Sequence, residues 1–403
     1  MTVWSFHTGL QSYGYFITWQ NIFRLFLTFH PISIPFSTLL YIFLLTLHPQ
    51  LIDFCTMTAE FTTTILQWFT TNRRELPWRE TRNPYAIWLS EIILQQTRIQ
   101  QGIAYWERFM HRWPTATDLA AATEDEVLRE WQGLGYYSRA RNLHKAAQQI
   151  AELGHFPSTI DSIRQLKGVG DYTAAAIASI AFDLPTAVVD GNVYRVLSRY
   201  YGIDIPINTT EGKKTFTALA QELLPPTQAS AFNQAMMDFG AIQCTPQSPL
   251  CDACPLIETC DAYHTKRIHQ LPVKLHKLRI RERHFSYYFI RCNEHGTTLT
   301  AIRRRPSGDI WQGLWEPLLI EHSPLDIGQW TVPDNLRDSR FKIHSVKKDV
   351  KHILTHQVIY ADFYLVETNL RPDLPSTFQW IAESELNQYA LPRLVEILIN
   401  SLP

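Results

Sequence analysis

The sequence has no marked excess of charge of either sign. Its 37 lysine and arginine residues face 38 aspartate and glutamate residues, so the formal net charge is −1. This balance excludes binding of nucleic acid through overall charge, and any DNA-binding surface must be local. Six cysteines in 403 residues are too few for a disulfide scaffold. Neither an internal repeat nor a low-complexity tract is present, which leaves a globular protein of two or three domains.

The first 57 residues have almost no charge, since Arg24 and Asp53 are their only ionic side chains. The densest apolar run, residues 36–47, is shorter than the roughly 20 residues that cross a bilayer. No basic segment precedes it and no small-residue cleavage site follows, so a signal peptide fits poorly. A membrane anchor stays an alternative. We interpret residues 1–57 as an extension of doubtful function, from an upstream start, before a domain that opens near Met57.

Helical periodicity begins at residue 58. Phe61, Ile65, Trp68 and Phe69 follow the spacing of an amphipathic helix. Further helices are predicted over residues 86–101, 124–131, 140–153, 171–182, 193–201 and 230–241. Because strand-like alternation is nearly absent here, residues 58–263 are predicted to form an all-α domain.

A basic segment, residues 264–284, follows this domain. Its seven lysines and arginines are opposed only by Glu282; they are Lys266, Arg267, Lys274, Lys277, Arg279, Arg281 and Arg283. The segment is predicted to be a linker whose charges either neutralise DNA phosphates or are simply solvated. Beyond it the period changes to that of strands, over residues 285–291, 297–302 and 359–365, and a helix is expected near residues 391–402. Residues 285–403 are therefore predicted to form an α+β domain.

Four of the six cysteines are crowded into 17 positions: Cys244, Cys251, Cys254 and Cys260. Thiolates bind both zinc and iron–sulfur clusters, so ligand type alone does not decide between them. Zinc sites usually contain two Cys-x2-Cys pairs, whereas only one such pair is present here. The spacing alone therefore predicts a metal site in a reducing compartment, and it leaves the choice between zinc and an iron–sulfur cluster open. The separate Cys55 and Cys292 are interpreted as free thiols.

A second motif, LKGVGDYTA at residues 166–174, predicts a helix–hairpin–helix. Gly168 and Gly170 permit backbone turns that other residues disfavour, and they let amide groups approach a phosphate closely. The small residues that follow allow tight helix packing.

Two carboxylates have surroundings suited to acid chemistry. Glu91 lies in an apolar helical segment, where desolvation raises a carboxyl pKa so that the group holds a proton. Asp190 opens a helix, where free amides and the helix dipole favour the ionised form. Gln95 is four residues beyond Glu91 and is expected on the same helical face. One neutral and one anionic carboxyl group is the division that hydrolysis of a glycosidic bond needs.

Several motifs occur in the order typical of one family. They are residues 76–79 (LPWR), 88–97 (WLSEIILQQT), 133–141 (GLGYYSRAR), 189–192 (VDGN) and 232–238 (FNQAMMD), and together they resemble the MutY family of adenine DNA glycosylases. The cysteine spacing also matches the [4Fe–4S] loop of the larger endonuclease III superfamily. The resemblance covers residues 58–365. It implies a [4Fe–4S] cofactor that organises a DNA-contacting loop.

The resemblance also implies roles for individual residues. Glu91 would protonate adenine N7 and later help to activate water, and Asp190 would stabilise or capture the sugar cation. Tyr172 and Asn192 would support this chemistry through hydrogen bonds. Bifunctional relatives have a nucleophilic lysine where this chain has Tyr172, so purely hydrolytic chemistry is implied. Trp78, Arg79 and Gln234 match positions that line the pocket of the flipped adenine. Gln96 and Tyr136 match positions that enter the DNA stack beside the orphan base, and Gln95 is expected among the substrate-binding residues.

The C-terminal domain resembles the Nudix-like domain of MutY, which recognises 8-oxoguanine. Residues 303–308 and 313–317 carry this likeness, and the metal-binding Arg-Glu-x-x-Glu-Glu cluster of a Nudix hydrolase is missing. Where relatives have a Phe-Ser-His turn, this chain has Leu354-Thr355-His356. Thr355 and His356 are therefore the expected lesion-reading residues.

Together these features predict a monofunctional adenine glycosylase that acts on adenine paired with 8-oxoguanine or guanine in duplex DNA. We expect a cytoplasmic monomer without a membrane partner. An endonuclease III-like lyase is the main alternative among enzymes. An iron–sulfur electron carrier and an inactive DNA-binding protein are the alternatives outside them.

Overall fold

The computed structural model describes residues 58–275, 280–323, 333 and 336–403. The predicted extension over residues 1–57 and part of the predicted linker lie outside these residues. The chain divides into two compact units. The described parts of the first are residues 58–88, Ser158–Gln165 and Val169–Leu275. The second comprises Leu89–Pro157, Leu166–Gly168 and the described residues from 280 onward, so the boundary falls within helix α3 (Pro84–Ile93).

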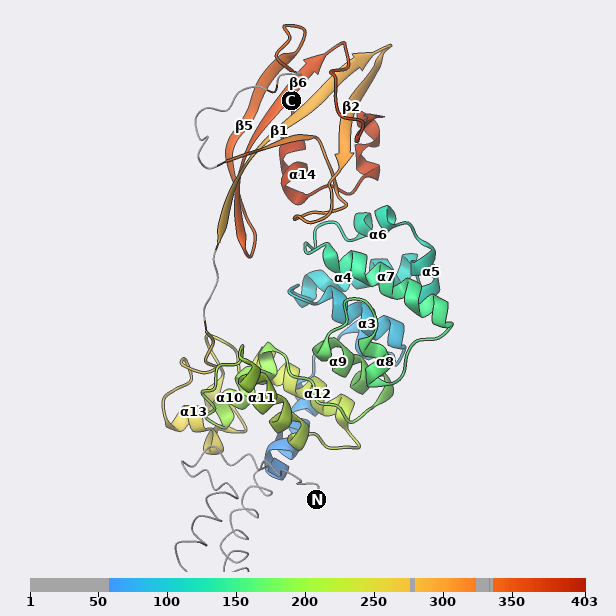
Figure 1. The fold of residues 1–403 in the computed structure, drawn as a ribbon. Coiled ribbons are helices and arrows are strands. Elements are labelled where there is room, and N and C mark those ends of the chain that lie inside the picture. The colour runs from blue at the N-terminus through green and yellow to red at the C-terminus, as the bar shows by residue number, and fades with distance from the viewer. Residues whose placement is uncertain (1–57, 276–279, 324–332, 334–335) are drawn as a thin grey trace, which may run out of the picture. The chain divides into compact units, whose positions relative to one another are not determined.

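The first unit is helical (Figure 1). The predicted helical residues 58–263 fall partly in this unit and partly in the second. Its core joins Phe61 and Ile65 to Phe216 and Phe232, all buried. Residues 58–72 form its first helix. The other helical elements are η1 (Pro77–Arg79), α8 (Ile160–Arg164), α9 (Asp171–Phe182), α10 (Gly191–Tyr200), α11 (Thr210–Leu223), α12 (Ala229–Asp238), the π-helix η2 (Phe239–Gln243), η3 (Cys251–Ala253), η4 (Ile257–Thr259) and α13 (Asp261–His264).

The second unit begins with a helical part. Its helices are α4 (Ile99–Arg112), α5 (Ala116–Ala121), α6 (Glu124–Glu130) and α7 (Ser138–Leu153). Thr115 and Thr123 start α5 and α6 through capping boxes with Asp118 and Glu126, which satisfy amide groups that a helix start leaves free. Gly154 ends α7 with a left-handed φ of 72°.

A seven-stranded mixed sheet forms the rest of this unit, which confirms the predicted α+β class. Its main path is β3-β2-β1-β6-β5, with β4 paired to β1 and β7 to β2. Only β1 and β6 run parallel among these pairs, with Phe285 opposite Ala361. The strands are β1 (Arg281–Glu294), β2 (Thr297–Arg304), β3 (Trp315–Glu316), β4 (Leu318–His322), β5 (Lys342–Ile353), β6 (Gln357–Thr368) and β7 (Phe378–Ala382); η7 (Glu383–Gln388) and α14 (Arg393–Ile399) follow.

Both faces of strand β1 are covered. Phe285, Tyr287 and Phe289 lie in one cluster with the buried side chains of α14, which packs against the sheet in Figure 1. Tyr288 and Ile290 lie in a second cluster. Because both sets of alternating side chains are buried, β1 lacks the polar–apolar alternation of a half-exposed strand.

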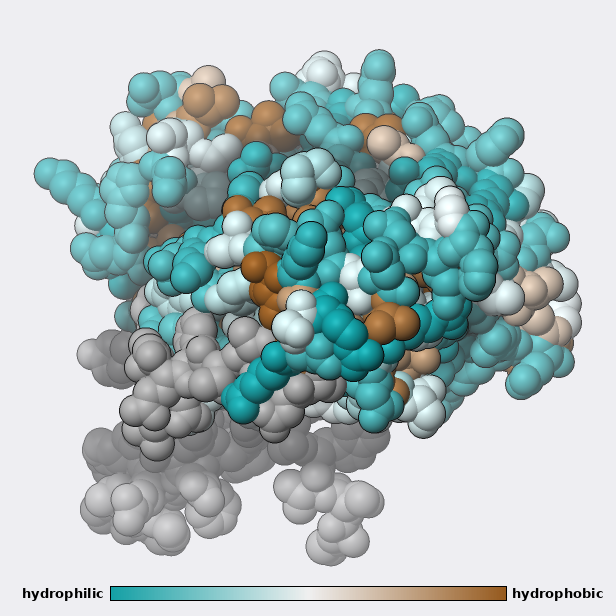
Figure 2. Space-filling view, turned by 90° about the horizontal axis from the view of Figure 1, so that it is seen from above, coloured by the Kyte–Doolittle hydropathy of each residue, from teal (hydrophilic) through white to brown (hydrophobic). Residues whose placement is uncertain are grey.

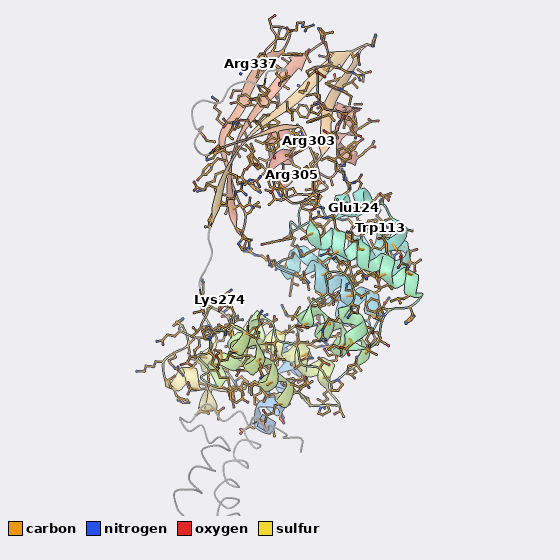
Figure 3. The ribbon with its side chains drawn as sticks, in the orientation of Figure 1. Trp113, Glu124, Lys274, Arg303, Arg305 and Arg337 are labelled. Carbon is orange, nitrogen blue, oxygen red and sulfur yellow. The ribbon has the colours of Figure 1, made fainter. Side chains whose placement is uncertain are left out.

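The predicted basic linker is shorter than expected. Strand β1 already begins at Arg281, and the Arg283 side chain is only 3 % exposed. Its guanidinium donates to both carboxylate oxygens of Asp309 at 2.7 Å and pairs with Glu321. Arg305, labelled in Figure 3, pairs with the same Asp309 and with fully buried Glu316. Arg283 therefore belongs to a buried ion-pair network and is not available to a phosphate.

One predicted helix, residues 86–101, is in fact two. Helix α3 ends at Ile93 and α4 starts at Ile99. The turn between them contains Gln96 with a left-handed φ of 59°. Carbonyl groups at this helix end accept hydrogen bonds from the buried Arg139 guanidinium. A tertiary contact of this kind has no signature in local periodicity.

The surface in Figure 2 is mainly hydrophilic on the face shown, with hydrophobic residues in small separate groups. Among the described residues, no helix is long and apolar enough to cross a bilayer.

Candidate active site

Glu91 lies in the last turn of α3 and is 8 % exposed. Its neighbours in sequence, including Leu89, Ile92 and Ile93, are buried, so the apolar setting expected for this carboxyl group is present. The prediction that Gln95 shares its helical face is wrong. Gln95 lies in the turn after α3, because the helix has ended two residues earlier.

Asp190 is the N-cap of α10. Its Oδ1 accepts hydrogen bonds from the backbone amides of Asn192 and Val193, each at 2.8 Å, and its Oδ2 accepts from Nδ2 of Asn192 at 2.8 Å. These hydrogen bonds favour the ionised form, as predicted, but burial acts in the opposite direction. Burial of Asp190 outweighs the hydrogen bonds and the charge of Arg195, and it raises the pKa of the carboxyl group.

Asn233 fixes the segment that leads to Asp190. From helix α12 its side-chain oxygen accepts from the amide of Val188 at 3.0 Å, and its Nδ2 donates to the carbonyl of Thr186 at 2.8 Å. A side-chain amide thus takes the place of a neighbouring strand for this extended stretch. Sequence reasoning did not find this role, because Asn233 lies 45 residues from Val188.

Arg195 joins the Asp190 hydrogen bonds to the cysteine loop. Its guanidinium donates to Oδ1 of Asn192 at 2.8 Å and to the carbonyls of Gly240 and Cys244 at 2.6 and 2.7 Å. A Cβ on Gly240 would lie 2.5 Å from Cβ of Asn192, so only glycine permits this approach. The i, i+3 spacing of Asn192 and Arg195 on α10 is the sequence signal for this pair, and it does not stand out from the many such spacings on helices.

Tyr172 lies in the first turn of α9 and is partly buried against the cluster of Ile87, Ala175 and Ile180. Its hydroxyl donates to Sδ of Met237 at 3.8 Å. This position therefore presents a phenol and no amine.

The side chains predicted to line an adenine pocket, Trp78, Arg79 and Gln234, have different surroundings. Trp78 is buried in η1. Arg79 donates to both carboxylate oxygens of Asp238, at 2.7 and 2.9 Å, and Arg74 binds the same carboxylate. Burial alone would raise the pKa of Asp238, but these two guanidinium groups outweigh it and lower the pKa. Arg79 therefore has a structural ion pair, while the Gln234 amide donates to the carbonyl and the hydroxyl of Ser230 in its own helix.

The two hairpin glycines have different reasons to be glycine. Gly168 has a φ of 78°, and a Cβ there would lie 2.7 Å from Cβ of Asn142. Gly170 has an extended φ of −94° and caps α9. A Cβ on Gly170 would meet nothing within 4 Å, so neither the backbone conformation nor steric crowding requires glycine at this position. Open space above the first amides of α9 is what an approaching anion needs.

Residues predicted at the DNA stack are exposed and lie in turns of the second unit. Gln96 and Tyr136 both have left-handed φ values, 59° and 46°. Thr355 and His356 form the exposed tip of the β5–β6 hairpin, closed by the amide of Leu354 bonding to the carbonyl of Gln357 at 2.8 Å. The hydroxyl groups of Tyr136 and Thr355 are hydrogen-bonded. Two predicted residues 219 positions apart are thus brought together.

The four clustered cysteines are free thiols, all partly buried. Burial and the proximity of the other thiols raise the pKa of Cys254 to about 12, despite an amide hydrogen bond that lowers it. Arg199 donates to Sγ of Cys244 at 3.4 Å. Among residues 58–275, 280–323, 333 and 336–403, no group of three or more His, Cys, Asp or Glu side chains is placed to hold a metal ion. The thiols of Cys244, Cys251 and Cys260 lie near enough to Cys254 to contribute to its raised pKa.

The predicted catalytic residues fall in both units. Asp190, Asn192 and Tyr172 belong to the first, and Glu91 belongs to the second. The hydrogen-bonded group of Asp190, Asn192 and Arg195 is complete within the first unit.

Comparison with known proteins identifies the class of this fold. Residues 89–226 match the HhH-GPD superfamily of base excision DNA repair proteins, and residues 287–401 match the NUDIX domain. A solved thermostable thymine-DNA glycosylase is 32 % identical, with a TM-score of 0.48, over 52 % of this chain and 97 % of that one.

Relatives at higher coverage define the family. The adenine DNA glycosylase of Buchnera aphidicola subsp. Baizongia pistaciae is 35 % identical over 76 % of this chain and 85 % of its own length. That of Schizosaccharomyces pombe is 30 % identical over 83 % and 87 %. The Mus musculus enzyme is 46 % identical over 52 % of this chain, and the chain spans less than half the length of the mammalian relatives. The chain belongs to the MutY family of adenine DNA glycosylases, which confirms the resemblance seen in the motifs.

Proposed function

We propose that this protein is a monofunctional DNA glycosylase that hydrolyses the N-glycosidic bond of adenine paired with 8-oxoguanine, or with guanine, in duplex DNA. The observation that carries the proposal is the buried Asp190 carboxylate, held at the start of α10 by three hydrogen bonds in a chain of this family. An anion fixed in this way suits the stabilisation of positive charge that develops on a sugar.

The reaction needs one acid and one anion. The Glu91 carboxyl group gives its proton to adenine N7, and the electron pair of the C1′–N9 bond leaves with the base. Asp190 balances the charge on the sugar cation until water adds at C1′ and returns a proton to Glu91. Glu91 is buried among apolar neighbours, which shields the proton transfer from bulk water.

Tyr172 supports hydrolysis without strand cleavage, since a phenol does not form a Schiff base. Borohydride reduction during turnover is therefore expected to give no covalent protein–DNA complex with an 8-oxoguanine:adenine duplex. The Tyr172→Lys variant, which restores an amine at the start of α9, is the matched control and should be trapped. Trapping of the wild-type protein to a similar extent would contradict the proposal and favour the lyase alternative.

DNA recognition is proposed for two parts of the chain. The open space at Gly170 suits a phosphate at the start of α9, and exposed Gln96 and Tyr136 would enter the base stack. At the β5–β6 tip, Thr355 and His356 supply a hydroxyl and an imidazole for 8-oxoguanine. The hydrogen bond between Tyr136 and Thr355 supports a shared place at the lesion.

The donor set of the cysteine loop fits an iron–sulfur cluster in number and type, because such clusters are held by four thiolates. We propose that Cys244, Cys251, Cys254 and Cys260 hold a [4Fe–4S] cluster. When bound, it would organise the loop that follows η2.

Purified protein is therefore expected to be straw-brown, with an absorbance band near ~400 nm from cysteine-ligated iron. Cys254→Ala should lose this band. Cys292→Ala, which removes a buried thiol outside the loop, should keep it. A colourless wild-type protein containing zinc would show that the cofactor assignment is wrong.

A further inference from the structure

Two exposed side chains of the second unit share an unusual backbone conformation. Gln96 and Tyr136 have φ values of 59° and 46°, a left-handed region that non-glycine residues rarely adopt. Such conformations persist where surrounding contacts determine them. The contacts that hold these two turns therefore decide how both side chains are presented.

One guanidinium group holds both turns. Nη1 of Arg139 donates to the carbonyls of Ile92 and Ile93 at 3.1 and 3.0 Å, and to that of Gln95. Nη2 donates to the carbonyls of Leu134 and Gly135, both at 3.3 Å. The first three carbonyls end α3 just before Gln96, and the other two directly precede Tyr136. Arg139 lies on α7 and is 9 % exposed.

Aromatic rings complete the setting of this group. The Cζ atom of Arg139 lies 5.1 Å from the ring centre of Trp131 and 5.6 Å from that of Tyr136. Nε1 of Trp131 donates to the carbonyl of Gly135 at 3.0 Å. Burial lowers the pKa of Arg139 to about 10, so the group remains charged at neutral pH. A positive charge is favourable at the C-terminal end of a helix such as α3.

We infer that Arg139 is a positioning residue for the opening of the DNA stack, because its one guanidinium fixes both the Gln96 turn and the Tyr136 turn. This inference rests on the proposed function, in which those two side chains enter the stack. Lysine cannot replace it, since a single ammonium lacks the planar fork that serves carbonyl groups on two turns.

The test compares Arg139→Lys with Arg112→Lys, an exposed arginine of α4 in surface ion pairs. The probe is an 8-oxoguanine duplex with 2-aminopurine beside the lesion and 2′-fluoroadenosine opposite it. The electron-withdrawing fluorine destabilises the positive charge that develops on the sugar, so the base is not released. Fluorescence rises when the stack opens. Arg139→Lys is expected to lose most of this rise and Arg112→Lys none.

On an ordinary 8-oxoguanine:adenine duplex, Arg139→Lys is expected to slow single-turnover adenine release about 10- to 100-fold, as misplacement of a positioning group does. Because Arg139 holds both turns, adding Arg139→Lys to the double variant Gln96→Ser/Tyr136→Ser is expected to slow adenine release no further. Losses that multiply would indicate a merely structural role and overturn the inference.

The outcomes separate this inference from the proposed function. If Tyr136→Ser leaves the fluorescence unchanged, the stack-opening role fails and the Arg139 inference fails with it. If Tyr136→Ser lowers it and Arg139→Lys does not, only the Arg139 inference is overturned. Should Arg139→Lys fail to fold, Trp131→Phe removes one hydrogen bond to the same turn. Trp131→Phe is expected to lower the fluorescence rise by less than Tyr136→Ser does. An unchanged rise would show that the contacts of this turn do not control the stack opening, and would overturn the inference for Arg139.

Discussion

Replacing Glu91 by glutamine is expected to slow adenine release by about 10²–10⁴-fold, the range that a general acid contributes, while binding of the mispaired duplex persists. Glutamine has nearly the shape of glutamate but no proton to give to N7. The side chain lies at the end of α3 and is 8 % exposed, so its burial is preserved by this change. Single-turnover kinetics and a gel-shift titration measure the two quantities separately.

Glu107→Gln is the matched control for this experiment. It makes the same chemical change on an exposed face of α4 and should leave both quantities unchanged. Near-normal turnover in Glu91→Gln would remove Glu91 from the acid role. A parallel loss of binding and turnover would instead indicate that Glu91 supports the fold.

Asp190→Asn is expected to lower the rate of adenine release by about 10²–10³-fold, comparable with removal of one group that stabilises a charged transition state. Asparagine is nearly as good an N-cap as aspartate, so the melting temperature should change little. Asp118→Asn, at an exposed capping position of α5, is the control. A large fall in melting temperature would show that the Asp190 carboxylate stabilises the fold, and the loss of rate could then not be assigned to stabilisation of the sugar cation.

The raised pKa of Asp190 has a direct consequence for the pH profile of the wild-type enzyme. Activity requires the carboxylate, and a raised pKa means that this form is lost at a higher pH than for an ordinary aspartate. On the acid side of the pH profile, kcat/KM should therefore fall at a higher pH than protonation of an ordinary aspartate would cause. Asn192→Ala removes the donor to Oδ2 and should move this fall to still higher pH. A fall that moves to lower pH would contradict the assignment.

Local sequence patterns predicted those helices and strands that are marked by their own apolar or small residues. Helix α9 has the predicted bounds, because a run of small residues between Gly170 and Asp183 marks both ends. Strands β1, β2 and β6 were found from apolar side chains, whereas β5 was missed. Its side chains are largely polar and exposed, and two register shifts interrupt its pairing with β6. An edge strand of this kind has little hydrophobic signal.

Distant contacts set what the sequence could not show. The end of α3 depends on Arg139, and so does the displacement of Gln95 from the Glu91 face. The pKa of Asp190 depends on burial by the fold, which outweighs the helix-end effect that the local sequence suggests. The local sequence predicts that Arg283 is part of a basic linker, but in the structure its buried guanidinium forms ion pairs with Asp309 and Glu321. Arg139 lies 47 and 44 residues from Ile92 and Gln95. Asp309 and Glu321 lie 26 and 38 residues from Arg283.

Excision of adenine opposite 8-oxoguanine is the central claim, and one duplex tests it. The duplex contains a single 8-oxoguanine:adenine pair, and the strand with the adenine is labelled at its 5′ end. The account predicts release of free adenine and cleavage of the labelled strand at that position only after alkali treatment. Cleavage without alkali, or no base release from a duplex that the protein binds, would contradict it.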